Sequence, residues 1–164
     1  MIVVSDTSPL RYLVAIGGID WLPVLFGEVI CPPEVIEECL HPGAPAELRN
    51  WASSCPAWLR VVKGETGSLP LPDGSVLDRG EDAALRLARN LPADLVLIDE
   101  RKGRAVAARL GLAVAGTVGV LVEASLRGLT DFDGAIQRLR EGTNFRIEDD
   151  ILALARSRVL ASKR

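Results

Sequence analysis

Acidic and hydroxyl side chains follow three short apolar runs of this chain, at positions where buried strands are expected to end. Asp6 follows "IVVS", Asp99 and Glu100 follow "LVLI", and Thr117 follows "AVAG". The carboxyl ends of parallel strands meet at one edge of an open α/β sheet, and ligands bind in the crevice beyond that edge. We therefore expect these side chains to lie close together.

Two helical patterns add further acids to the same crevice. In "PPEVIEECL" the apolar stripe places Glu38 at the margin of the core, with Glu37 as its close competitor. In "DRGEDAALRLA" Glu81 stands one turn before the buried side of the expected helix. Four acids are thus candidates for one site, namely Asp6, Glu38, Glu81 and Asp99.

Such a cluster of carboxylates repels itself unless cations neutralise it, and oxygen-only ligands are those that Mg²⁺ and Mn²⁺ prefer. Metal ions in such a site activate water and stabilise the charge that develops on a phosphodiester. This chemistry needs no histidine, and the only histidine is His41, in an expected loop. Without a Gly-x-Ser-x-Gly motif, serine and cysteine hydrolase chemistry is disfavoured.

Each candidate also has a purely structural explanation. Asp6 could cap the helix that follows it, and Asp78 with Glu81 has the spacing of a capping box. Glu38 could be a solvated helix residue. A purely structural role fits Asp99 less well, because a buried acid needs a partner or a cation. Basic residues near the crevice could contact phosphates or form a solvated helix face: Arg79, Arg101, Lys102 and Arg104.

The elements that would position these residues alternate between short strands and longer helices. This rhythm predicts crossover units and a mainly parallel sheet covered on both faces, which is an α/β fold. We expect one domain over residues 1–164, two closing helices after Gly128, and a frayed tail at 160–164. Residues 41–78 are rich in Gly and Pro and are expected to be largely loop, with a mobile part at 62–77.

Composition limits the classes of function. The chain has 164 residues, a net charge of −3 and a pI of about 5.3, so a nucleic acid would have to be met by metal ions or a local basic patch. The three cysteines form no Cys-x-x-Cys pair, which favours a reducing, cytoplasmic setting. The longest apolar stretch is too short for a membrane helix.

Taken together, these segments resemble the PIN-domain family of metal-dependent ribonucleases, and most closely its VapC-type branch of toxin-like proteins from toxin–antitoxin pairs. The resemblance rests on "VVSDTSPL", "CPPEVIEECL", "LDRGEDAALRLA", "LVLIDERKGRAVAARLGLAVAGTVGVLVEASLRGL" and "FRIEDDIL". It implies a three-layer α/β/α sandwich, Mg²⁺ or Mn²⁺ as cofactor, RNA as substrate, a homodimer and a small antitoxin partner. It places metal binding and catalysis on Asp6, Glu38, Glu81 and Asp99, with Thr117 near the site.

Two other hypotheses remain open from the sequence. One is a PIN-like module that binds RNA or protein without cleaving it, because its acid cluster is degenerate. The other is a phosphorylatable receiver-like switch, which would require a lysine near "AVAGT" that the chain lacks. The sequence also leaves open whether one or two metal ions bind, and whether Glu100 supplies an additional acid.

Overall fold

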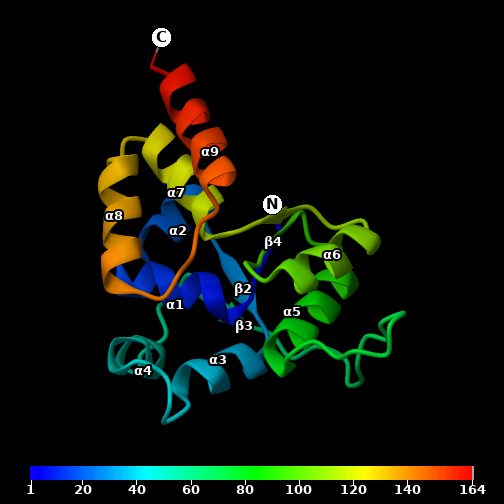
Figure 1. Cartoon of the computed structure of the whole chain (residues 1–164). Coiled ribbons are helices and arrows are strands. Elements are labelled where there is room, and N and C mark those ends of the chain that lie inside the picture. Colours follow the sequence, from blue (N-terminus) through cyan, green and yellow to red (C-terminus); the bar gives the residue numbers. More distant parts are fainter. Residues whose placement is uncertain (164) are drawn as a thin grey trace.

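A five-stranded parallel sheet forms the centre of the computed structural model, which describes residues 1–163 (Figure 1). Within these residues, strands and helices follow one another in this order: β1 (Val3–Ser5), α1 (Thr7–Ala15), α2 (Trp21–Phe26), β2 (Val29–Cys31), α3 (Pro33–Leu40), α4 (Ala46–Ser53), β3 (Leu59–Val61), α5 (Arg79–Asn90), β4 (Leu95–Leu97), α6 (Arg101–Arg109), β5 (Val114–Ala115), α7 (Thr117–Leu126), α8 (Phe132–Gly142) and α9 (Asp149–Ala161).

The order of the strands across the sheet is β3-β2-β1-β4-β5, and every neighbouring pair is parallel. β1 lies at the centre, where Val4 pairs with Ile30 of β2 on one side and with Val96 of β4 on the other. The two strands that precede Asp6 and Asp99 are therefore neighbours. Their carboxyl ends lie at one edge of the sheet, as the sequence predicts.

Helices cover both faces of this sheet. Side chains alternate between the two faces along each strand, so the apolar residues on each face need a layer of helices to bury them. Val3 and Leu97 pack into a core that includes residues of α1, α7 and α8. Val4, Val96 and Ile98 point the opposite way and pack against α5 and α6. Figure 1 shows α5 and α6 on one side of the strands and α1 and α8 on the other. The predicted α/β/α sandwich is confirmed.

Residues 41–78 contain more regular structure than the sequence suggests. Helix α4 and strand β3 lie in this region, which we expected to be largely loop, and α2 was not predicted either. The apolar pattern of α4 consists of only two buried residues, Leu48 and Ala52. In β3 only Leu59 is buried, because β3 is an edge strand. Such short patterns between Pro and Gly residues do not predict an element.

The segment at 62–77 forms neither helix nor strand and is attached to α5. Leu69 and Leu77 are buried against the α5 and α6 side of the core. The side chain of Asp82 accepts a hydrogen bond from the Leu69 backbone N–H at 2.7 Å and pairs with Arg86, which also donates to the Glu65 carbonyl. The mobility of this segment remains a prediction.

Two closing helices, α8 and α9, follow the positive-φ residue Gly128 as expected. Helix α9 continues to Ala161, so the first part of the predicted frayed tail at 160–164 is helical, and Arg164 lies outside the described residues. In residues 1–163, no helix combines the length and apolar character needed to cross a bilayer.

Candidate metal centre

Asp6 occupies the junction between the central strand and the first helix. It stands at the N-cap position of α1 in an extended conformation, but its side chain makes no capping hydrogen bond. Only 2% of Asp6 is exposed, and its Oδ1 atom has no hydrogen-bond partner among the described residues. Because an unpaired buried carboxylate oxygen is costly, capping does not account for this residue.

Two further carboxylates converge on Asp6. One oxygen of Glu38 in α3 and one of Asp78 at the start of α5 lie with an Asp6 oxygen within 4.8 Å of one another. Asp6 is buried, Glu38 is half-buried and Asp78 is exposed, so the group extends from the core to the surface. Three negative charges at this distance are unfavourable without a compensating cation.

Glu38 is held in this position by two donors. The Thr7 hydroxyl donates to Oε2, and the Gly80 backbone N–H donates to Oε1 at 2.7 Å. A Cβ atom at position 80 would lie 2.5 Å from Oε2, so only glycine allows this approach. The competing Glu37 instead pairs with Arg79 at the surface. Of the two candidates, Glu38 is the one that reaches the cluster.

Asp78 and Glu81 take different parts in the N-cap of α5. The Glu81 backbone N–H donates to Asp78 Oδ1 at 2.8 Å, so Asp78 caps the helix. Glu81 is 4% exposed, and its carboxyl lies close to Gly103, where a Cβ atom would meet Oε2 at 3.0 Å. Glu81 thus supplies a backbone donor to the cap, and its carboxyl remains beside Asp6 and Asp78.

The electrostatics of the cluster favour protonated acids when no cation is present. Burial, reinforced by the nearby charges of Asp78, Glu38 and Asp99, raises the pKa of Asp6 to about 8. Burial also raises the pKa of Glu81 to about 8, with contributions from Asp78 and Asp6. Near neutral pH these carboxyls hold protons that a metal ion would have to displace.

Asp99 lies at the end of β4 and is oriented by the first residue of α7. The backbone N–H and the hydroxyl of Thr117 each donate to one of its oxygens, both at 2.7 Å. Burial raises the pKa of Asp99, while Thr117 and the charge of Arg104 lower it. Asp99 is thus an oriented acid beside the three-carboxylate cluster, close enough for its charge to act on Asp6.

Of the four basic residues predicted to contact phosphate, Arg79 begins α5 and pairs with Glu37, and the other three lie on α6 with different partners. Arg101 pairs with Glu148 at 3.2 Å, and Lys102 donates to the Val76 carbonyl at 3.0 Å, on the segment at 62–77. Arg104 donates to the Ile98 carbonyl at 3.3 Å and lies nearest to Asp99. Arg104 is therefore the basic side chain that the fold brings to the acids, and Lys102 points to the loop.

We expected Asp78 to be a helix cap rather than one of the four ligands, and we did not predict that Thr7 and Gly80 would contact Glu38. The position of Asp78 depends on where the segment at 62–77 returns the chain to the sheet, which no local pattern encodes. The role of Thr7 could have been predicted from the sequence. A hydroxyl that directly follows an aspartate at the end of a strand lies near any ligand bound at that edge of the sheet.

Comparison with known families agrees with this geometry. A family model described as a PIN domain matches residues 2–160. This chain belongs to the PIN-domain family. No curated protein and no solved structure matches the chain. PIN domains are usually nucleases that use divalent metal ions, so the acid cluster of this PIN domain is in the setting where such chemistry is expected.

The residues present fit such an ion. The donor set of this PIN domain consists of carboxylate oxygens alone, which suits a hard divalent cation. The buried Asp6 Oδ1 atom, without a partner in residues 1–163, is the atom that most needs one. Asp6, Glu38 and Asp78 would hold the ion, with Glu81 and Asp99 beside them.

Proposed function

We propose that this PIN domain is a divalent-metal-dependent endoribonuclease that hydrolyses RNA phosphodiesters with Mg²⁺ or Mn²⁺. The observation that carries the proposal is the buried, unpartnered Oδ1 atom of Asp6 with the carboxylates of Glu38 and Asp78 converging on the same residue. Asp78 also caps α5, but among the described residues none of the three carboxylates pairs with a basic side chain, and Asp6 Oδ1 has no donor at all. A metal-binding role explains why three acids converge without a positively charged side chain between them.

Each residue has a distinct task in this proposal. A bound divalent ion lowers the pKa of water and neutralises charge on a phosphodiester. Asp6, Glu38 and Asp78 bind the ion, and Thr7 with Gly80 orients Glu38. The Glu81 carboxyl, with its pKa raised to about 8 by burial, is suited to hold or release a proton near neutral pH. Thr117 fixes both oxygens of Asp99.

The biological setting is part of the same proposal. The quoted motifs resemble VapC-type toxins, which supports a role as the RNA-cleaving toxin of a toxin–antitoxin pair, a homodimeric state and a small antitoxin protein as partner. The free cysteines, of which Cys31 and Cys39 are buried, support a reducing cytoplasmic location. Expression of the wild type in a bacterial host should arrest growth, whereas Asp6→Asn should not.

The direct test is cleavage of a mixed RNA pool by purified protein. We expect wild type to cut with Mg²⁺ or Mn²⁺ and to stop when EDTA is added, and Asp6→Asn and Asp78→Asn to lose at least about 100-fold in rate. Asp20→Asn is the matched control. Asp20 also occupies an N-cap position without a side-chain capping bond, but it is exposed.

Two results would contradict the proposal. One is cleavage by Asp6→Asn at the wild-type rate, which would place the activity elsewhere or in a contaminant. The other is a wild type that binds RNA but does not cut it with either ion, which would favour the alternative of a degenerate PIN-like binding module.

A further inference from the structure

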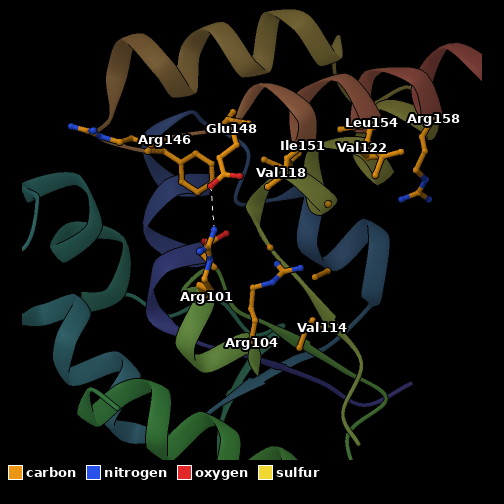
Figure 2. A pocket seen from close by; sticks show the side chains of 17 residues that line it. Arg101, Arg104, Val114, Val118, Val122, Arg146, Glu148, Ile151, Leu154 and Arg158 are labelled. Atoms are coloured by element: carbon orange, nitrogen blue, oxygen red, sulfur yellow. Dashed lines mark hydrogen bonds and ion pairs between the residues drawn. The ribbon is translucent and has the colours of Figure 1, made fainter. Parts of the chain in front are cut away.

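A pocket of about 560 Å³ borders the acid cluster on the side of Asp99 (Figure 2). Residues of α6, β5, α7, α9 and the α8–α9 connection line it, and we call it the α7–α9 pocket. Its volume lies in the range of pockets that bind small organic groups. Asp99, which lies beside the three carboxylates of the candidate metal centre, belongs to its wall.

One wall of the α7–α9 pocket is apolar and exposed. Figure 2 shows Val118 of α7 next to Ile151 of α9, with Leu154 one turn further along α9. Ile151 is 49% exposed and Leu154 68%, although α9 also contributes the buried residues Leu152 and Ala155 to the core. Large apolar side chains exposed beside a cavity mark a binding surface.

Arginines outnumber acids among the charged residues of the lining. Four arginines and two acids line the pocket in a chain whose net charge is −3. Arg104 extends from α6 into the pocket beside Asp99, while Arg101 spans to Glu148 at the start of α9 (Figure 2). An apolar wall opposite a guanidinium group matches a nucleotide, whose base is flat and weakly polar and whose phosphate is an anion.

The connection between α8 and α9 fixes the shape of the pocket. Asn144 Oδ1 accepts hydrogen bonds from Arg11 and from the Tyr12 hydroxyl, each at 3.1 Å. The Phe145 ring, which lines the pocket, packs edge-on against Tyr12 with ring centroids 4.8 Å apart. The Arg101–Glu148 pair holds the other end. The pocket is therefore preformed, which reduces the entropic cost of binding.

We propose that the α7–α9 pocket binds one unpaired nucleotide of the RNA strand next to the phosphodiester that is cut. The base packs on Val118, Ile151 and Leu154, and Arg104 contacts the phosphate. This inference rests on the proposed ribonuclease function. Because a base must leave its helix to enter a pocket of this kind, the site selects single-stranded RNA and discriminates among bases at this position.

The position of the α7–α9 pocket next to the acids favours RNA as its occupant. The wall of the pocket includes Asp99, so whatever occupies the pocket lies next to the acid cluster. A substrate strand must pass there, because the phosphodiester lies at the acids and its next nucleotide extends along the sheet edge. The arginines in the lining supply local positive charge in a chain whose net charge is −3.

The test is equilibrium binding of fluorescein-labelled single-stranded RNA of about ten nucleotides, followed by fluorescence anisotropy in EDTA so that no cleavage occurs. Leu154→Asp and Arg104→Ala should each weaken binding about tenfold. The matched controls are Leu160→Asp and Arg109→Ala, which should bind like wild type. Leu160 is exposed on α9 and Arg109 on α6, and neither lines the pocket.

A comparison with duplex RNA and a kinetic measurement separate the possible outcomes. Wild type should bind the single strand more tightly than a duplex of the same sequence, and in Mn²⁺ the Leu154→Asp variant should raise KM and leave kcat near the wild-type value. Unchanged binding and KM in both pocket variants would overturn the subsite and leave the nuclease proposal intact. RNA binding through the pocket without any cleavage would overturn the nuclease proposal and leave the subsite.

Light scattering measures the mass in solution and tests whether the pocket is an interface between copies of the chain. Leu154→Asp should have the same mass in solution as wild type. A change in mass together with unchanged RNA binding would show that the pocket is an interface between copies of the chain, and would overturn the proposal.

Discussion

Glu38 reaches the acid cluster because residue 80 has no side chain. The Gly80 backbone N–H donates to Glu38 Oε1 at 2.7 Å, a hydrogen bond that a Cβ atom at this position would obstruct. Thr7 supplies the second donor, so the orientation of Glu38 depends on two residues that carry no charge. Metal affinity should therefore respond to changes that leave every acid in place.

Gly80→Ala tests this dependence. We expect about tenfold weaker Mn²⁺ binding, because a hydrogen bond to a charged group contributes roughly 1.5–3 kcal/mol. The fold should persist, since Ala favours helix more than Gly does. Calorimetric titration with Mn²⁺ measures the affinity. Gly142→Ala, at a helix end with no atom near the added Cβ, is the control, and equal affinities in the two variants would refute the explanation.

The raised pKa values of Asp6 and Glu81 predict how pH affects the metal-free protein. Burial raises both pKa values to about 8, from 3.8 and 4.5, so the folded state holds protons that the unfolded state has lost. Stability is therefore fully present below the unfolded pKa values and is lost as pH rises towards 8. Between pH 6 and pH 8 the free energy of unfolding in EDTA should fall by a few kcal/mol, on the order of magnitude that linkage gives.

Urea denaturation at several pH values measures this effect. Asp6→Asn should reduce the slope of the profile by about half, because the amide does not titrate whereas Glu81 still does. Mn²⁺ should restore more stability at high pH than at low pH. A wild-type profile that is level or rises with pH would show that the buried acids are already compensated by other groups.

At the scale of elements, α5 organises one side of the site. Its first turn supplies Asp78, Gly80 and Glu81, and its next turns fasten the segment at 62–77 through Asp82 and Arg86. The Asp82 and Arg86 side chains are 12% and 13% exposed. Because this segment leads directly into Asp78, the attachment also positions that acid.

Arg86→Ala should detach the segment. Removing one partner of a buried pair costs about 3–5 kcal/mol, and this slightly exposed pair should lie near the lower figure. We expect that loss in urea denaturation, together with faster proteolytic cutting between residues 62 and 77. Arg156→Ala, which breaks an exposed pair with Asp133, should cost less than about 1 kcal/mol. Equal losses in both variants would mean that the Asp82–Arg86 pair does not anchor the segment.

A helix or strand could be predicted from the sequence only where it contributes enough buried residues to give a clear apolar pattern. β1 and β4 are predictable because all three residues of β1 and most of β4 are buried, and their acids follow directly. β3 buries only Leu59, and α4 buries only Leu48 and Ala52, so neither stands out from its Pro- and Gly-rich surroundings.

At the scale of the whole molecule, the topology gathers acids from distant parts of the chain. Asp6, Glu38, Asp78 and Asp99 come from four separate segments, and the strand order β3-β2-β1-β4-β5 brings β1 and β4 together. The parallel-sheet rule was sufficient to predict that Asp6 and Asp99 would be neighbours. It could not place Asp78, whose position follows from the packing of an irregular loop, nor the α7–α9 pocket, which forms between helices far apart in the sequence.

Calorimetric titration of EDTA-stripped protein with Mn²⁺ shows whether the acids around Asp6 bind a divalent metal ion. The titration is best done at pH 8, near the pKa to which burial raises Asp6, so that proton competition is reduced. We expect saturable binding to wild type and to the exposed control Asp20→Asn, and none to Asp6→Asn. Absence of binding to wild type, or equal binding to wild type and Asp6→Asn, would contradict this expectation.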